Sequence, residues 1–400
     1  MKKNEVAGVF KKYTMLLALV AIMVIFEFLI NFMNKGSLFH PTNVSNIIGQ
    51  NGYVVVLATG MLLCILTGGN IDLSVGSIVA LVGALAGKLM ITFQVNIFVT
   101  MAICLFTGIV IGAFQGALIA YLRIPAFIVT LAGMLIFRGI SWVILQGVTL
   151  GPFPAEYRKY FNSFIPAIDG LATDPKTKAF VLTTSLIISV VACAVIIVIQ
   201  GLTMISRSRK GYNDEPWQKW LKIIMTGITC AAIMLLSWRL GLNKGMPVVL
   251  IWIAVVVGIY AYFTAKTVPG RHFYAMGGNE KAAKLSGVNT DRILFGAYTN
   301  MGLLSAVAAL MCVARFDSAA PSAGTGYELD AIAACYVGGA SAYGGTGTVG
   351  GAVIGAIFMG VMNNGMSILG LGPDWQRIVK GFVLLLFVAI DVLSRRSKRA

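Results

Sequence analysis

The chain has 400 residues, of which 58% are hydrophobic and 12% are charged, about half the charged fraction of an ordinary soluble domain. A surface this poor in polar groups cannot cover a globule in water, so a soluble globular protein is excluded and the lipid bilayer is the expected surroundings. The formal net charge of +16 does not indicate a nucleic-acid partner, because the basic residues lie between apolar runs and at both chain ends.

Apolar runs that are long enough to form helices follow one another along the whole chain. The first, at residues 13–33, is too long for the core of a signal peptide and lacks a small-residue cleavage site, so we expect a retained span. The others lie at 52–67, 73–93, 97–122, 126–148, 179–202, 221–240, 247–265, 293–313, 330–340, 349–371 and 378–393. Two pairs, around Gly68-Gly69 and Gly344-Gly345, are so closely spaced that each could be one broken or re-entrant element. The sequence therefore predicts an all-α, polytopic transmembrane bundle of 10 to 12 spans, with residues 1–400 as one domain.

The positions of the basic residues set the expected orientation. Both ends of the chain are basic, through Lys2, Lys3, Lys11, Lys12, Arg395, Arg396, Lys398 and Arg399. Because Lys and Arg concentrate on the cytoplasmic side of membrane proteins, we expect both termini in the cytoplasm and an even number of spans. Residues 203–222 then form a cytoplasmic basic loop, and residues 266–292 form a second cytoplasmic loop. Residues 149–178, rich in proline and aromatic residues, form an extracytoplasmic cap segment.

The segment GGNIDLSVGSIVAL, at residues 68–81, joins two of the apolar runs. Asp72 or Ser74 is able to cap the helix that follows. A carboxylate at the centre of a bilayer costs about 2.5–3.5 kcal/mol, so we expect Asp72 to be paired, to cap the helix, or to face a water-filled cavity. Capping is favoured over a contact with a substrate.

A second glycine-rich segment, at residues 337–366, ends in two adjacent amides. Asn363 and Asn364 could line a polar route or form hydrogen bonds between helices, and the interhelical bonds are favoured. The glycines and small residues of 338–350 also echo those of 68–76, with a different spacing. Two explanations stay open: the segments are an internal repeat, or glycine-rich helix starts look alike by chance.

The middle of the inner loop at 266–292 has the pattern of a short helix. Asn279 is a suitable N-cap, and Glu280 favours the positive end of the helix dipole. Glu280 also pairs with Lys284 four residues later, and Gly287 suits the left-handed position after a helix. These signals predict a helix of about two turns.

Such a short helix is marginal alone in water and needs a surface on which to dock. We expect Ala282, Ala283 and Leu285 to be exposed, so that they could enter a groove on a cytoplasmic partner. Alternatively, the helix lies on the protein's own inner surface or at the lipid interface. The residue pattern leaves both interpretations open.

The sequence indicates no catalytic, metal or cofactor site. His40 and His272 are the only histidines, no HExxH or GxSxG motif occurs, and the six cysteines lie in apolar runs without CxxC spacing. No phosphate-binding G-x-x-x-x-G-K-[ST] motif occurs either, so another chain must bind ATP if ATP drives this protein. Glu27 is the one carboxylate near the middle of a long apolar run, which counts against an ion-coupled carrier.

Three stretches together resemble a known family: GGNIDLSVGSIVAL, GGNEKAAKLSGVN and SAAPSAGTGYELDAIAACYVGGASAYGGTGTVGGAVIGA. They are similar to the permease subunits of bacterial ATP-binding-cassette importers for monosaccharides, of the ribose, xylose and multiple-sugar type, which are related to branched-chain amino acid permeases. The likeness runs from about residue 45 to the last span. The length and the outer GPFP segment look most like the xylose and multiple-sugar branch.

This resemblance implies a multi-pass permease of the bacterial cytoplasmic membrane that moves a monosaccharide and is not an enzyme. It also implies a second permease copy in a homodimer, separate ATP-binding subunits and an extracytoplasmic sugar-binding protein that holds most of the selectivity. The coupling helix seated in the ATPase would consist of Asn279, Glu280, Ala282, Ala283, Leu285, Ser286 and Gly287. The candidates for the substrate pathway are Asp72, Ser74, Asn363 and Asn364. The alternatives are an ion-coupled or facilitative sugar carrier without an ATPase, and a membrane scaffold without transport activity.

Overall fold

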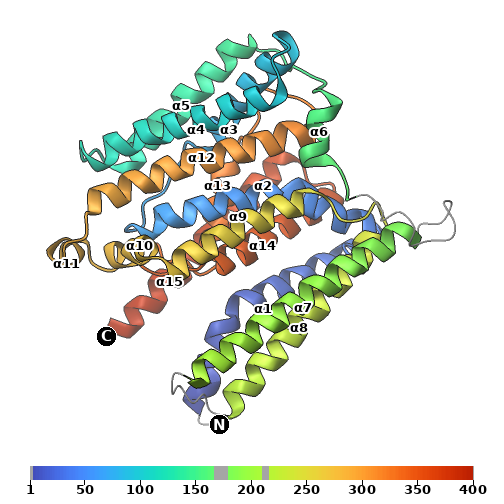
Figure 1. The fold of residues 1–400 in the computed structure, drawn as a ribbon, viewed down its shortest axis with the longest axis vertical. Coiled ribbons are helices and arrows are strands. Elements are labelled where there is room, and N and C mark those ends of the chain that lie inside the picture. Colours follow the sequence, from blue (N-terminus) through green and yellow to red (C-terminus); the bar gives the residue numbers. More distant parts are fainter. Residues whose placement is uncertain (1–2, 166–178, 210–215, 400) are drawn as a thin grey trace. The chain divides into compact units, whose positions relative to one another are not determined.

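The computed structural model describes residues 3–165, 179–209 and 216–399, which fold into helices joined by loops (Figure 1). The helices are α1 (Lys3–Phe32), α2 (Pro41–Leu66), α3 (Val75–Gly87), the π-helix η1 (Lys88–Thr92), α4 (Ile97–Ala120), α5 (Ala126–Leu145), α6 (Ala155–Asn162), α7 (Ala179–Arg209), α8 (Pro216–Gly241), α9 (Val249–Lys266), α10 (Val268–Gly278), α11 (Glu280–Leu285), α12 (Thr290–Phe316), α13 (Tyr327–Val337), α14 (Val349–Ile368) and α15 (Pro373–Arg399). In the described part, 10 helices are long and apolar enough to cross a membrane. This confirms the predicted all-α, polytopic bundle.

The chain divides into two compact units. Unit 1 comprises Met1–Leu38, Ile47–Ser163 and Val249–Ala400, and unit 2 comprises Phe39–Asn46 and Phe164–Val248. All the residues singled out above for substrate or coupling roles belong to unit 1.

Unit 2 is built on α7 and α8, which pack side by side (Figure 1). The side-chain amide of Gln200 donates a hydrogen bond of 2.9 Å to the Lys222 carbonyl, and the Cys193 sulfhydryl lies 3.7 Å from the Cys230 carbonyl oxygen. Most other apolar side chains on the two helices are exposed, as expected for helices that face lipid.

The predicted basic loop at 203–222 is largely helical in the structure. Helix α7 continues to Arg209 and α8 already begins at Pro216. Lys and Arg are good helix formers, so a helix can continue past the end of the apolar run that the sequence marks. Residues 210–215 lie outside the described residues.

The centre of unit 1 consists of α2, α3, α12 and α14, whose residues are mostly buried. Helices α4, α5 and α9 have mostly exposed apolar surfaces, with Phe106 of α4 67% exposed. A helix with an apolar outer surface is stable only where lipid replaces water, so these helices form the lipid-facing layer.

Helices α4 and α12 approach each other through glycines. Gly108, Gly112 and Gly116 recur every fourth residue on α4, the small-residue spacing that favours close contact between membrane helices. A Cβ on Gly108 would lie 2.5 Å from the carbonyl oxygen of Gly302, and a Cβ on Gly302 would lie 2.2 Å from that of Gly108. Backbone therefore packs directly on backbone here.

The two closely spaced pairs of apolar runs have different outcomes. Helix α2 and the continuous segment of α3 and η1 are each long and apolar enough to span, so Gly68-Gly69 joins two separate spans. Helix α13 has 11 residues and is therefore about 16 Å long, too short to cross a hydrocarbon core of about 30 Å. Residues 338–348 join this short helix to α14.

The segment predicted as the extracytoplasmic cap contains α6. The Tyr157 hydroxyl donates a hydrogen bond of 2.7 Å to the Leu310 carbonyl, and burial raises the pKa of Tyr157 well above its ordinary value, so it remains a donor. Arg158 forms an ion pair of 2.8 Å with Asp317, whose other carboxylate oxygen accepts a 2.9 Å bond from the Phe153 amide. These contacts fasten α6 to the end of α12. Residues 166–178 of the predicted cap lie outside the described residues.

Candidate functional site

The short helix expected in the inner loop is present as α11. The side chain of Asn279 accepts a hydrogen bond of 3.0 Å from the Ala282 amide, which is the predicted N-cap. Gly287 has a φ of +83°, the left-handed conformation predicted for the residue after the helix. The Ser286 hydroxyl donates a 2.9 Å bond to the Ala282 carbonyl and so helps to close the helix C-terminus.

The exposed face of α11 differs from the predicted one at a single residue. Leu285 is 90% exposed, and Ala282 is also exposed. Ala283, which was expected to be exposed, is 6% exposed and faces the protein. Successive residues of a helix are about 100° apart, so a helix that rests on its own protein must turn one residue of each turn inward. Leu285, with no apolar cover of its own, is the best candidate for a docking contact.

Arg123 holds the first residue of α11 in place. It forms ion pairs of 3.4 Å with Glu280 of α11 and 2.5 Å with Asp291, in the first turn of α12. Its side chain is about half exposed, so these pairs orient the loop more than they stabilise the fold. The sequence analysis did not identify Arg123, although its position between two apolar runs marks it as a loop residue.

Upstream of α11, α10 was not expected from the sequence. The Thr267 side chain accepts a 3.0 Å hydrogen bond from the Gly270 amide and caps this helix, while Pro269 occupies its first turn. Thr267, with proline two residues later, is the sequence signal that would have identified the helix start. Asn279 both ends α10 and caps α11, so the two helices are directly consecutive.

Asp72 and Ser74 lie together just before α3, and both are completely buried. One carboxylate oxygen of Asp72 accepts hydrogen bonds from the Ser74 amide at 2.8 Å and from the Ser74 hydroxyl at 2.6 Å. The side-chain amide of Gln115, on α4, donates a 3.0 Å bond to the Ser74 hydroxyl. Asp72 thus holds the residue at the N-cap position of α3 without bonding the helix amides itself. The second Asp72 oxygen has no protein partner within hydrogen-bonding distance.

Asn363 belongs to a different group of polar side chains. Its amide nitrogen lies 3.5 Å from oxygens of both Asn51 on α2 and Asp330 on α13. Asp330 is 1% exposed and forms an ion pair of 2.8 Å with Lys380 of α15. Side chains from four helices therefore meet here, which agrees with the favoured interhelical role of Asn363. The sequence analysis missed Asp330 and Lys380.

The four predicted pathway residues do not form one site. Among the described residues, no hydrogen bond joins the pair Asp72 and Ser74 to the group around Asn363. Asn364 is 7% exposed, and its side-chain oxygen has no hydrogen-bond partner. The described chain also contains no group of three or more His, Cys, Asp or Glu side chains able to hold a metal ion.

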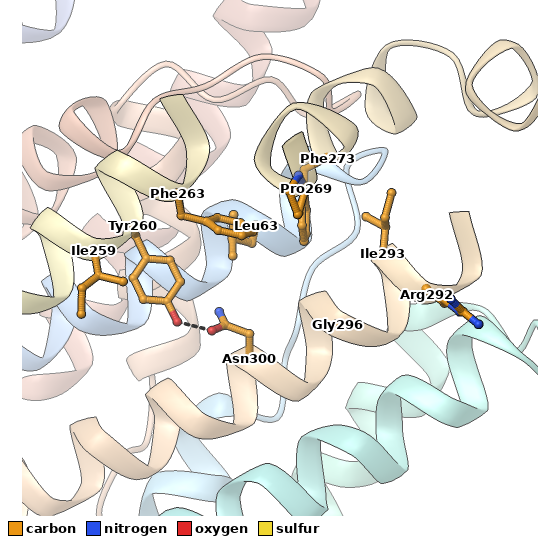
Figure 2. A pocket seen from close by; sticks show the side chains of 10 residues that line it. All are labelled: Leu63, Ile259, Tyr260, Phe263, Pro269, Phe273, Arg292, Ile293, Gly296 and Asn300. Carbon is orange, nitrogen blue, oxygen red and sulfur yellow. Dashed lines mark hydrogen bonds between the residues drawn. The ribbon is translucent and has the colours of Figure 1, made fainter. Parts of the chain in front are cut away.

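A cavity of about 420 Å³ lies between α9, α10 and α12, with α2 behind it (Figure 2). Across the cavity, the Tyr260 hydroxyl donates a hydrogen bond to the side-chain oxygen of Asn300. The side-chain nitrogen of Asn300 has no hydrogen-bond partner. The cavity is lined by Leu63, Ile259, Tyr260, Phe263, Pro269, Phe273, Arg292, Ile293, Gly296 and Asn300. None of the four predicted pathway residues lines it.

Three ionisable residues within apolar runs have structural partners. Glu27 accepts hydrogen bonds from the Ser37 hydroxyl and the Leu38 amide, both at 2.8 Å, and so fixes the turn after α1. Arg138 of α5 donates to backbone carbonyls of the loop before α13. Asp391 accepts a 3.2 Å bond from the Ala342 amide. These contacts account for the three charges without a role in ion coupling.

The fold of unit 1 is that of a polytopic membrane protein with short helices between its spans and an exposed helix in a polar loop. Residues 43–388 match the family described as "Branched-chain amino acid transport system / permease component", and the chain belongs to this family. This confirms the resemblance drawn from the sequence motifs and identifies the chain as a transport permease.

Individual relatives show the same relationship. The chain is 34% identical over 384 residues to the xylose transport system permease protein XylH of Escherichia coli, covering 96% of this chain and 92% of that protein. It is 35% identical to XylH of Haemophilus influenzae, covering 96% and 97%, and 35% identical to the ribose import permease protein RbsC of E. coli, covering 88% and 86%. No solved structure matches the chain.

Proposed function

We propose that this chain is the membrane-spanning permease of an ATP-binding-cassette importer that moves a monosaccharide across the bacterial cytoplasmic membrane. The observation that carries the proposal is the similarity over almost the full chain to permeases named for xylose and ribose. Both sugars are neutral polyols, which need hydrogen-bonding groups but no charged counter-site. The partners are separate ATP-binding subunits on the inside, an extracytoplasmic sugar-binding protein and a second permease copy.

Helix α11 is the element that docks on the ATP-binding subunit. Its support is structural: a complete helix of six residues, capped at Asn279, presents the 90% exposed Leu285. An isolated apolar side chain on a short helix fits a groove on another protein. Docking on a cytoplasmic partner requires α11, and with it both termini, to lie on the cytoplasmic side, as the basic residues at the chain ends also favour.

The sugar pathway passes the two groups of buried polar side chains in unit 1. Asp72 and Ser74 form one group, and Asn363 belongs to the other, with Asn364 next to it in the chain. Asp72, Asn363 and Asn364 each keep an oxygen without a hydrogen-bond partner, and such acceptors are available to sugar hydroxyls. In this mechanism, ATP-driven closure of the ATPase pair moves α11 and opens the pathway to the sugar-binding protein.

The deciding experiment is uptake of radiolabelled xylose and ribose into vesicles that contain the chain, its candidate ATP-binding subunit and the sugar-binding protein. Wild type should take up sugar only when ATP is present. Leu285→Asp should lose both uptake and ATPase association, because a charge replaces the apolar docking contact. Leu371→Asp, the same change in the loop between α14 and α15, is the matched control and should retain association.

Two results would contradict the proposal. Uptake driven by an ion gradient in vesicles without the ATP-binding subunit would favour a stand-alone carrier. Full association and uptake by Leu285→Asp would show that α11 does not dock on the ATPase.

A further inference from the structure

The end of α10 packs closely on the backbone of two other segments of unit 1. A Cβ built on Gly277 would lie 1.8 Å from the carbonyl oxygen of Leu66, at the end of α2, and 2.3 Å from the amide nitrogen of Gly345. The Gly345 amide itself donates a 3.1 Å hydrogen bond to the Leu66 carbonyl. No side chain other than that of glycine fits at residue 277 without moving backbone.

The same place joins the two glycine-rich segments that the sequence analysis compared. A Cβ on Gly69 would lie 2.0 Å from the Ala342 carbonyl oxygen, and a Cβ on Gly344 would lie 2.5 Å from the backbone of Gly68. The loop that connects α2 to α3 therefore packs on the loop that connects α13 to α14. We call the contact among Gly68, Gly69, Gly277, Gly344 and Gly345 the glycine junction.

The glycine junction is tied closely to the exposed helix α11. Gly277 is two residues before Asn279, which ends α10 and caps α11. The Tyr274 hydroxyl donates a 3.0 Å hydrogen bond to the Gly347 carbonyl, a second link from α10 to the loop before α14. Burial raises the pKa of Tyr274, so this hydroxyl keeps its proton at neutral pH.

Close backbone packing makes this contact suited to transmit movement. Packed protein interiors are dense and weakly compressible, and side chains that can change rotamer are the usual means of absorbing small shifts. The glycine junction has no such side chains at Gly277, Gly344 or Gly345. A displacement of α10 must therefore displace the loops before α3 and before α14.

We propose that the glycine junction passes movement of α11 to the loops that begin α3 and α14, and that Gly277 is a positioning residue for transport. This inference rests on the proposed function, because it assumes that α11 docks on an ATPase. Asp72 and Ser74 lie in the loop before α3, and Asn363 and Asn364 lie on α14, the helix that the other loop begins. One contact is thus connected through the chain to all four predicted pathway residues.

Gly278 provides a matched control for Gly277. It is the next residue in the chain, and a Cβ there would have no neighbour within 4 Å. Gly277→Ala and Gly278→Ala therefore make the same chemical change on adjacent residues. Only the first change pushes the glycine junction apart.

The experiment measures the number of sugar molecules imported per ATP hydrolysed in vesicles that contain the full complex. Gly277→Ala should keep its ATPase association and hydrolysis but lower this ratio by about tenfold or more, as expected for an overpacked contact. Gly278→Ala should match wild type. This ratio does not depend on how much protein folds. If Gly277→Ala only reduced the amount of folded complex, the ratio would therefore stay unchanged.

Tyr274→Phe serves as a second variant in case Gly277→Ala does not insert. It removes one hydroxyl that donates to the loop before α14, and it should lower the same ratio by about threefold. Two combined results would overturn the inference. In both, Tyr274→Phe has the wild-type ratio of sugar imported to ATP hydrolysed; Gly277→Ala then either has the same ratio as Gly278→Ala or is absent from the membrane. A wild-type complex without ATP-dependent uptake would instead overturn the proposed function on which it rests.

Discussion

The Asp330 carboxylate lies in the core of unit 1, where it pairs with Lys380 at 2.8 Å. Two charges removed from water gain attraction in a low dielectric but lose hydration, so such a pair contributes little net stability. Removal of only one partner is different, because the other charge stays buried without compensation. The pair therefore constrains how α13 and α15 pack.

We predict that Asp330→Asn and Lys380→Met each lower the free energy of unfolding by about 3–5 kcal/mol. The double variant should recover most of that loss, since it leaves neither charge buried. Chemical unfolding of the purified protein in detergent, analysed as a double-mutant cycle, measures the coupling. A loss in the double variant equal to the sum of the two single losses would show that the two charges do not compensate each other.

Residue-level predictions from the sequence succeeded where the signal was local. Asn279 as a cap and Gly287 in the left-handed conformation depend on fewer than ten consecutive residues, and both are present. The partner of Asp330 is 50 residues away on another element, and no local pattern specifies it. The inward orientation of Ala283 likewise depends on the surface below α11, which sequence periodicity over six residues cannot define.

At the scale of single elements, α11 depends on its N-cap more than longer helices do. It has six residues, so it contains few internal hydrogen bonds to offset the cost of helix initiation. We predict that Asn279→Ala destabilises α11 by about 1 kcal/mol. Hydrogen exchange of the α11 amides should then be about fivefold faster.

Asn289→Ala is the comparable change on a longer helix. Asn289 caps α12 through a 2.9 Å bond from the Arg292 amide, but α12 has 27 residues and extensive packing. Its exchange should increase only in the first turn. If Asn279→Ala left the exchange of α11 unaltered, packing on the protein and not the cap would be what maintains this helix.

The contact between α4 and α12 gives a second prediction for elements. Gly302→Ala should lower the free energy of unfolding by about 1–3 kcal/mol, because its Cβ would meet the Gly108 carbonyl at 2.2 Å and force the helices apart. Gly296→Ala, on the same helix with open space around it, should be neutral or slightly stabilising. Thermal unfolding of both variants in the same detergent tests this difference.

For the whole molecule, apolar runs located the spans well because lipid imposes a minimum length and a composition on each of them. The run at 349–371 corresponds to the candidate span α14, whereas the run at 330–340 corresponds to α13, which is too short to cross the membrane. The sequence could not show that the loops after α2 and α13 pack on each other, because Gly69 and Ala342 are far apart in the chain. The sequence also predicted a loop at 203–222, but α7 and α8 extend beyond their apolar runs into both ends of that segment.

The orientation of the whole molecule remains a prediction, and exposed side chains allow it to be tested. Leu285 of α11 is 90% exposed and belongs to the predicted cytoplasmic loop, while Glu156 of α6 is exposed in the predicted extracytoplasmic segment. Of the native cysteines, all are buried except Cys230, which is partly buried, so their background reactivity should be low. Single cysteines at 156 and 285 can therefore be compared in the wild-type background.

We predict that Glu156→Cys reacts with a membrane-impermeant maleimide in intact cells, or in spheroplasts where an outer membrane is present. Leu285→Cys should react only after the cytoplasmic membrane is permeabilised. The physical reason is the concentration of Lys and Arg, including Arg271, Lys281 and Lys284, around α11, which the membrane potential and lipid charge retain on the inner side. The reverse labelling pattern would place α11 outside, where no ATP-binding subunit could reach it, and would contradict the proposed coupling role together with the orientation.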